Sequence, residues 1–246
     1  MKIRFLGTSH GVPGADRHCQ SIVIEAGGSV YLIDAGAPVT DLMLHYGYDL
    51  NSLRAVFITH CHGDHLNGLI HLADLAGWYF KEMDFDMFIP EKSVGDAMLN
   101  YIEAISPDYV ANSERLRIRT QAVGLVYEDE NIKVTAYPTD HMIYFSRPAY
   151  GYLVEADGKR VYISGDLNHN LIDYPQLTNT EELDAFIVEC AHFPAEQLVE
   201  NLMSTKAKKV LITHVFPLEK YEVFESFRSK AHFELMLPCD GDSFEI

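Results

Sequence analysis

Short apolar runs bounded by turn residues recur along most of the chain, and they predict strands. Gly27-Gly28 and Asp157-Gly158 fall where hairpin turns are needed, and the second pair is a strong two-residue turn signal. The predicted strands are residues 3–6, 21–26, 30–33, 55–58, 133–137, 150–155, 160–163, 185–188 and 209–212.

Helical periodicity appears between these runs. Residues 65–80 place Leu66, Leu69, Ile70, Ala73 and Ala76 on one apolar stripe. Similar periodicity predicts helices over 91–105, 196–204 and 217–230, the last with a proline near its first turn. Because strands and helices interleave without an internal boundary, we expect an α+β (mixed α/β) fold and a single domain over residues 1–246.

The charge balance narrows the function classes. The 246 residues carry 19 Lys+Arg against 36 Asp+Glu, a formal net charge of −17, within an ordinary globular composition of 48% hydrophobic residues. Binding along a polyanion depends largely on Lys and Arg replacing condensed counterions, so this charge argues against a nucleic-acid partner without excluding one. It allows a small anionic substrate that a metal holds.

The compartment is predicted from what the chain lacks. Its amino terminus has no apolar run of signal-peptide length, and no stretch approaches the roughly 20 apolar residues of a membrane span. The four cysteines (Cys19, Cys61, Cys190 and Cys239) are scattered without paired spacing. We therefore expect a cytoplasmic protein with reduced thiols and no membrane partner.

The segment Ile58-Thr59-His60-Cys61-His62-Gly63-Asp64-His65 is the most informative. In an extended chain His60 and His62 point the same way, and Gly63 permits a sharp turn that aims Asp64 and His65 at a neighbouring point. This suits two adjacent cations, and imidazole and carboxylate are suitable ligands for zinc and related metals. A surface cluster without function is the alternative, but polar side chains at a strand end are costly unless something satisfies them.

The motif resembles the metal-binding signature of the metallo-β-lactamase fold superfamily. Further family landmarks appear in the expected order along the chain. Asp34 precedes the motif, and His141, Asp166, His214 and the Asp240-Gly241 pair follow it. Taken singly, His141 could be a turn residue, Asp166 a helix N-cap and His214 a strand-end histidine. Each follows a predicted strand, however, so together they converge on one sheet edge, and the resemblance covers essentially the whole chain.

The resemblance implies a four-layer αββα sandwich and two divalent metal ions. Zinc is the expected metal, with manganese or iron as alternatives. Asp34 is expected to orient the ligands from behind them. The implied ligands are His60, His62 and His141 for one ion, Asp64, His65 and His214 for the other, and Asp166 between them.

Residues 5–13, Phe-Leu-Gly-Thr-Ser-His-Gly-Val-Pro, resemble the opening of ribonuclease Z and related phosphodiesterases, as do residues 148–152. Aspartate at position 166 argues against β-lactamases, which often carry cysteine there. The match to ribonuclease Z is incomplete, because the chain shows no Gly/Pro-rich basic arm for tRNA. Arg115, Arg117 and Arg119 alternate within residues 106–120 and are expected on the solvent face of an edge strand.

These features predict a hydrolase of a small phosphodiester. Two adjacent ions can acidify a shared water and stabilise the transition state, and Asp64 is assigned to this catalytic centre. The leaving alkoxide then needs a proton. His192 and Glu189 are the candidate donors, although His192 could equally be a surface histidine before Pro194.

Other interpretations stay open. A ribonuclease Z-like tRNA 3′-endonuclease, a thioesterase or a lactonase would use the same metal centre. A metal-binding sensor is the alternative outside enzymes. Tyr144, Phe145, Arg147 and Tyr150 are candidates for lining the pocket, or for core or lid packing. The predicted partner is a small-molecule substrate, and a homodimer is an open assembly.

Overall fold

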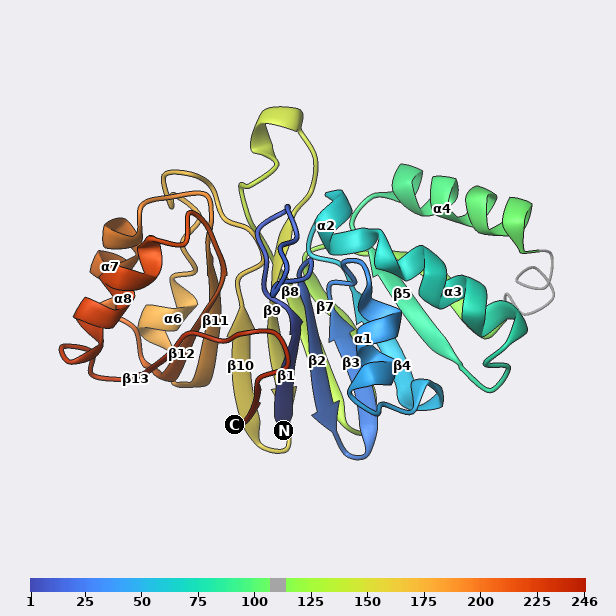
Figure 1. Cartoon of the computed structure of the whole chain (residues 1–246), viewed down its shortest axis with the longest axis horizontal. Coiled ribbons are helices and arrows are strands. Elements are labelled where there is room, and N and C mark those ends of the chain that lie inside the picture. Colours follow the sequence, from blue (N-terminus) through green and yellow to red (C-terminus); the bar gives the residue numbers. More distant parts are fainter. Residues whose placement is uncertain (107–113) are drawn as a thin grey trace.

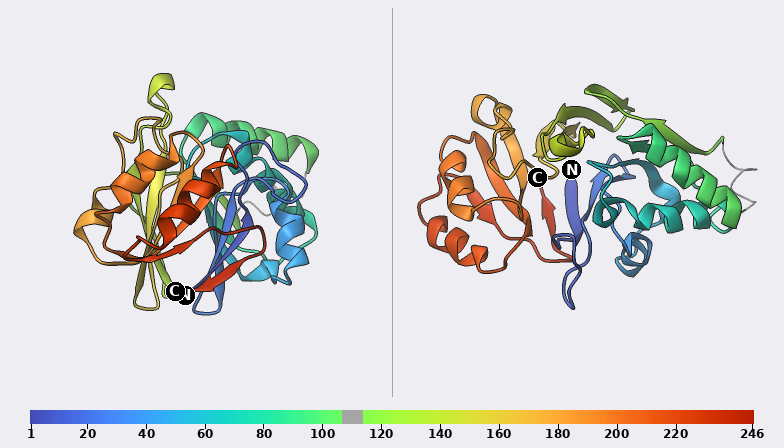
Figure 2. Two further views of the ribbon diagram at one scale, coloured as in Figure 1. Left: turned by 60° about the vertical axis from the view of Figure 1, so that its left-hand side comes forward. Right: turned by 90° about the horizontal axis from the view of Figure 1, so that it is seen from above.

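The computed structural model describes residues 1–106 and 114–246. Two mixed sheets of seven strands each pack face to face, with helices on both outer sides (Figure 1). This arrangement confirms the predicted α+β class and the four-layer αββα sandwich. Both ends of the chain lie at the lower edge of the molecule in Figure 1, side by side, and the left view of Figure 2 agrees.

The first sheet is built from the amino-terminal half of the chain and one carboxy-terminal strand. Strands β14 to β3 are antiparallel, and β3 to β6 are parallel. Its order is β14 (Ser243–Glu245), β1 (Lys2–Gly7), β2 (Ser21–Ala26), β3 (Ser29–Ile33), β4 (Leu53–Phe57), β5 (Phe85–Ile89) and β6 (Leu116–Thr120).

The second sheet repeats this plan. Strands β7 to β10 are antiparallel, and β10 to β13 are parallel. Its order is β13 (Glu234–Met236), β12 (Ala207–Val215), β11 (Leu183–Cys190), β10 (Lys159–Ile163), β9 (Tyr150–Ala156), β8 (Ile132–Pro138) and β7 (Gly124–Glu128).

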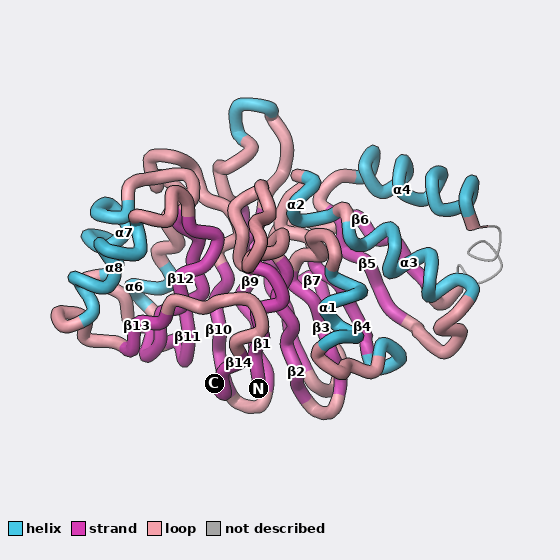
Figure 3. The backbone as a smooth tube through the Cα atoms, viewed as in Figure 1, coloured by secondary structure: helices cyan, strands magenta, loops and turns pink. Residues whose placement is uncertain are grey.

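Helices cover the outer face of each sheet (Figure 3). The first sheet carries α1 (Val39–His45), α2 (Gly63–Leu66), α3 (Gly68–Trp78) and α4 (Lys92–Ile105), and the second carries α6 (Leu177–Thr180), α7 (Ala195–Leu202) and α8 (Lys220–Arg228). Two short 3₁₀ turns, η1 (Leu50–Ser52) and η2 (Ile143–Phe145), complete the described elements.

Three apolar cores hold these layers together. Phe5, Phe57 and Tyr152 belong to the core between the sheets. The two outer cores join each sheet to its own helices, for example through Leu69 of α3 and Leu198 of α7. A central strand such as β3 thus buries one face against the other sheet and one against helices, which explains its continuous apolar run. Edge strands such as β7 and β14 stay partly exposed.

Most predicted elements lie where the pattern placed them, with shifts of one to a few residues at their ends. The helix predicted at 65–80 is instead two helices, α2 and α3, separated at Asn67. Strand β6 is an edge strand, as expected for the arginine-rich segment, and Arg117 and Arg119 pair with Asp86 of β5. Residues 107–113 of that segment lie outside the described part.

The topology gathers loops at one edge. The parallel strands β3, β4, β10, β11 and β12 all end at the upper edge in Figure 1, where the two sheets meet. Ligand sites of mixed α/β sheets typically lie beyond the carboxyl ends of such strands. The four cysteines are unpaired. Within the described residues, no helix has the length and apolar character needed to cross a bilayer.

Candidate metal centre

The histidine motif follows β4 as the pattern predicted. Strand β4 ends at Phe57, and the chain bends at Thr59 and His60. His62 is extended, and helix α2 begins after it at Gly63. His60 Nε2 and His62 Nδ1 lie 2.9 Å apart, so the two side chains do point to one place. The turn at Gly63 then directs Asp64 and His65 toward a second place.

Two triads of potential ligands result. In the first triad (His60, His62 and His141), His62 Nδ1 also lies 3.4 Å from His141 Nε2, although 79 positions separate these residues in the sequence. In the second triad (Asp64, His65 and His214), Asp64 Oδ2 lies 3.2 Å from His65 Nε2 and 3.9 Å from His214 Nε2. These are the two ligand sets that the resemblance implied.

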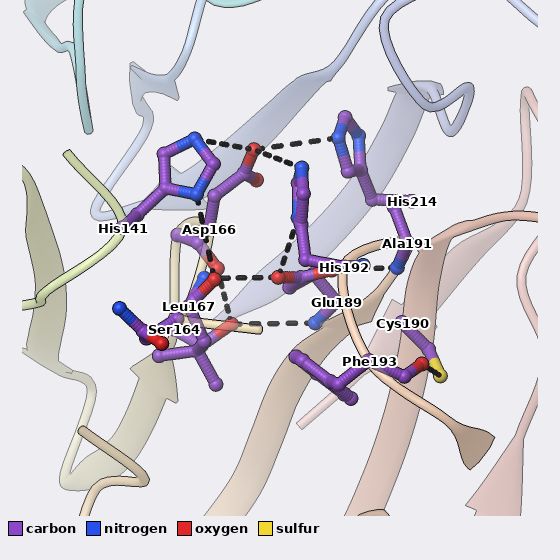
Figure 4. Close-up of polar contacts among 12 residues, drawn as sticks. His141, Ser164, Asp166, Leu167, Glu189, Cys190, Ala191, His192, Phe193 and His214 are labelled. Atoms are coloured by element: carbon purple, nitrogen blue, oxygen red, sulfur yellow. Dashed lines mark hydrogen bonds and ion pairs between the residues drawn. The ribbon is translucent and has the colours of Figure 1, made fainter. Parts of the chain in front are cut away.

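Asp166 lies between the triads, just beyond β10. A single oxygen, Oδ2, is 3.6 Å from Nε2 of both His60 and His65. It is also 3.7 Å from His141 Nε2 and 3.5 Å from His214 Nε2 (Figure 4). The carboxylate is only 3% exposed. One buried oxygen thus faces histidines of both triads, which is the position that a bridging ligand requires.

Asp34, at the end of β3, orients the second triad from behind. His65 Nδ1 donates to Asp34 Oδ2 at 2.7 Å, which leaves His65 Nε2 directed at the cluster. The backbone N–H of Thr59 donates to the other oxygen of Asp34 at 2.8 Å. Asp34 and His214 both have positive φ, 60° and 52°, a backbone conformation that is costly for residues other than glycine. Such strain is typical of functional sites.

The electrostatics of the cluster favour cations. Burial lowers the pKa of His60, His62 and His141, which keeps these imidazoles neutral and able to bind metal. Burial alone would also lower the pKa of His65, but the charges of Asp166 and Asp34 raise it well above its usual value. The buried carboxylates therefore draw positive charge to the second triad.

The residues fit two metal ions. Buried His65 Nε2 makes no aligned hydrogen bond, although Asp64 Oδ2 lies 3.2 Å away. A buried polar atom without such a bond is costly unless a ligand satisfies it. The donors are imidazole nitrogens and carboxylate oxygens, the ligand types that zinc and related first-row metals accept. Each triad supplies three of them, and Asp166 supplies one more to both.

Glu189 and His192 lie beside the cluster, at the end of β11. His192 Nδ1 donates to Glu189 Oε1 at 2.8 Å, and His192 Nε2 is 3.8 Å from Asp166 Oδ2 (Figure 4). Burial lowers the pKa of His192, but the hydrogen bond and charge of Glu189 outweigh burial and raise it to about 9. His192 is therefore not a free surface histidine, and it also groups with His141 and Asp166 as a potential ligand set.

The cavity over the cluster is about 230 Å³, and its lining adds residues that the sequence analysis did not assign to the site. His10, in the loop after β1, stacks on Phe216 with ring centroids 3.8 Å apart, and both line the cavity. His10 stands in the glycine-rich segment after a predicted strand, and that position was the available signal. Phe216 had none beyond following His214.

The aromatic residues after His141 lie elsewhere. Tyr144, in η2, is 74% exposed, and Arg147 pairs with Glu91. Tyr150 packs in the core between the sheets. Neither these residues nor Phe145 line the cavity over the cluster. Core packing is thus the outcome for Tyr150.

The comparison with known families decides the relationship. The family described as anti-Pycsar protein Apyc1 matches residues 1–215, most of the chain and every residue of the two triads. The chain belongs to the Apyc1 family. This Apyc1-family chain is also 33% identical over 159 residues to a ribonuclease Z of Methanocaldococcus jannaschii. That match covers 62% of the chain and 47% of the relative, so it spans about half of the relative's length.

Solved structures show the fold of this Apyc1-family member. Human tRNase Z, short form, is 20% identical with a TM-score of 0.78, covering 100% of this chain and 99% of the other. The metallo-β-lactamase fold protein YhfI of Bacillus subtilis is 16% identical with a TM-score of 0.76, at 100% and 99% coverage. These likenesses confirm the predicted metallo-β-lactamase fold.

Proposed function

We propose that this chain is a metal-dependent hydrolase of a small phosphodiester, with two divalent ions, most simply zinc. The observation that carries the proposal is the position of Asp166 Oδ2. This oxygen lies within 3.7 Å of two histidine nitrogens in each triad. A carboxylate shared in this way would let the chain hold two divalent cations at adjacent sites, and paired cations suit displacement at phosphorus.

The residues around the cluster have separable tasks. When bound, the two ions would lower the pKa of water and neutralise charge on the phosphoryl oxygens. His60, His62 and His141 would hold one ion, and Asp64, His65 and His214 the other. Asp34 fixes the tautomer of His65 through its 2.7 Å hydrogen bond. Asp64, predicted as catalytic, acts here as a ligand of the second ion.

His192 is the proposed proton donor to the leaving group. Glu189 accepts from His192 Nδ1, so that Nε2 faces the cavity that His10 and Phe216 also line. Glu189 is buried, and within the described part of the chain its carboxylate accepts from N–H groups, which makes it the group that orients His192 rather than the donor itself. A positioned general acid contributes about 10²–10⁴-fold in rate.

Cavity size and charge favour a small substrate. About 230 Å³ of cavity accommodates a compact diester, and the net charge of −17 opposes the approach of a polyanion. Arg117 and Arg119 are committed to Asp86, which weakens their use as an RNA clamp. The similarity to a ribonuclease Z supports a second candidate, a tRNA 3′-endonuclease, which would use the same metal centre.

A substrate panel tests the proposal. The zinc-reconstituted protein is assayed on bis(p-nitrophenyl) phosphate, a thioester, a lactone and a precursor tRNA, with Asp166→Ala as the inactive control. We expect turnover of the phosphodiester above the thioester and lactone. Efficient 3′ trimming of the tRNA, well above the small diester, would favour the second candidate. Binding of metal without hydrolysis of any substrate would indicate a sensor.

A leaving-group comparison tests His192. His192→Ala should keep two equivalents of metal and lose at least about tenfold in turnover on a diester with a poor leaving group. The loss on p-nitrophenolate should be smaller, because that leaving group needs little protonation. Equal losses on both substrates would point to substrate binding, and loss of metal would make His192 a ligand in the set with His141 and Asp166.

A further inference from the structure

Residues 190–193, the end of β11 and the short loop after it, are held by two charged side chains. The carboxylate of Glu189 accepts from N–H groups. Its Oε2 accepts from the backbone N–H of Ala191 at 2.6 Å and of His192 at 3.3 Å, while Oε1 accepts from Leu167 N at 2.9 Å (Figure 4). The loop is therefore wrapped around one buried negative charge.

A single ammonium group donates hydrogen bonds to the backbone carbonyls of the same residues. Lys220 Nζ, from the first turn of α8, donates to the carbonyl oxygens of Cys190 at 3.0 Å, Ala191 at 3.0 Å and Phe193 at 2.7 Å. These three hydrogen bonds use all three N–H donors of the ammonium group. Among the described residues, the recorded partners of Nζ are carbonyl oxygens and not carboxylates.

The position of Lys220 is not explained by its own helix. A cation in the first turn of a helix opposes the helix dipole, which favours negative charge at that end. Helix α8 would be served better by a neutral or acidic residue there. The three carbonyls that Lys220 holds lie immediately before and after His192, so the geometry ties the lysine to the loop.

We propose that Lys220 is a positioning residue for His192. The inference rests on the proposed role of His192 as proton donor. The carbonyls of residues 190, 191 and 193 fix the backbone on both sides of position 192, and Glu189 fixes its N–H and its Nδ1. With both sides held, His192 Nε2 stays 3.8 Å from Asp166 Oδ2. Without Lys220 the carbonyls turn to water, and the ring of His192 samples other positions.

The first test is kinetic and uses Lys220→Met, which keeps the length of the side chain and removes the charge and donors. Lys206→Met is the matched control, because Lys206 Nζ also donates to a backbone carbonyl, that of Thr180 at 3.1 Å, on an exposed part of the chain. We expect Lys220→Met to lose about tenfold in kcat on the poor leaving group, since small displacements of a catalytic group are costly. KM and metal content should be unchanged.

The double variant separates positioning from general stability. In the His192→Ala background, Lys220→Met should cause little further loss, because the group that it positions is gone. An additive loss, or a loss of equal size on good and poor leaving groups, would overturn the inference. If Lys220→Met does not fold, Lys220→Arg is compared in the same way, since its planar, larger head cannot reach three carbonyls as an ammonium does.

The second test does not depend on activity. In the metal-free protein, the amide protons of Ala191 and His192 should exchange faster in Lys220→Met than in wild type or Lys206→Met, measured by nuclear magnetic resonance. Unchanged exchange would overturn the inference even if the protein hydrolysed no phosphodiester. Faster exchange in a protein that hydrolyses none would leave the loop as described and refute the proposed function instead.

Discussion

Asp34→Asn should lower the affinity for one metal ion and leave the affinity for the other unchanged. Asparagine has the shape of aspartate and tolerates the left-handed backbone found at position 34, where φ is 60°. Its Oδ1 can still accept the Thr59 N–H, which holds the start of the histidine motif. In the variant, the NH₂ group of the asparagine faces His65 Nδ1. In the wild type, His65 Nδ1 donates to a carboxylate oxygen of Asp34 at 2.7 Å. Two donors cannot pair.

The consequence is a change of tautomer. His65 can relieve the clash by accepting at Nδ1 and carrying its proton on Nε2, but a protonated Nε2 is no metal ligand. A hydrogen bond to a charged group contributes about 1.5–3 kcal/mol, which is roughly 10–150-fold in affinity. Loss of such an outer partner of a histidine ligand typically costs about 10–100-fold, and the two magnitudes agree.

The assay is a zinc titration of the metal-free protein in competition with a chelator. For Asp34→Asn we expect one equivalent to bind about 10–100-fold more weakly, from the second triad, and the other to bind as in wild type. Asp49→Asn is the matched control, because Asp49 is an exposed aspartate that accepts from a backbone N–H far from the cluster. Equal weakening of both equivalents, or of neither, would refute the reasoning.

Two further predictions concern the metal centre as a whole. Asp166→Asn should weaken both equivalents of metal in that titration, because Asp166 Oδ2 faces histidines of both triads, and full occupancy with full activity would exclude a bridging role. Removal of both metal ions by a chelator should lower Tm by about 11–22 °C relative to metal at about 100 times the Kd of each site, given about 2.7 kcal/mol per ion and about 2–4 °C per kcal/mol. Calorimetry with and without chelator measures this, and an unchanged Tm would show that the folded state gains nothing from metal.

The positions of the candidate ligands could be predicted from the sequence because each one has a local signal, the apolar run just before it. Each of His60, Asp166 and His214 stands a few residues after an apolar run, and parallel strands bring such positions to one edge. His60 and His62 do converge, with their nitrogens 2.9 Å apart, although the chain bends at Thr59 and His60 instead of continuing as a strand. Their roles as ligands stay predictions until metal is measured.

Elements without a clear pattern were missed. Strand β5 is a run of five residues, Phe85–Ile89, with Asp86 in its interior, and that aspartate breaks the apolar signal. The structure satisfies Asp86 with Arg117 and Arg119 of the neighbouring strand. A buried charge of this kind is compatible with a strand only because its partner comes from another strand, which no local pattern records.

The surroundings of His192 show where prediction from sequence ends. His192 follows Glu189 by three positions, near the end of a strand. This spacing could have suggested a turn in which the Glu189 carboxylate accepts from the backbone N–H groups that follow it. The structure contains that turn. Lys220, which binds the carbonyls of this turn, lies 27 to 30 positions away in sequence from the residues it contacts, on a helix whose pattern indicates only an apolar face. Three hydrogen bonds to carbonyls leave no mark in the identity of Cys190, Ala191 or Phe193. The electrostatic support of a catalytic loop is thus the part of this site that only the tertiary structure reveals.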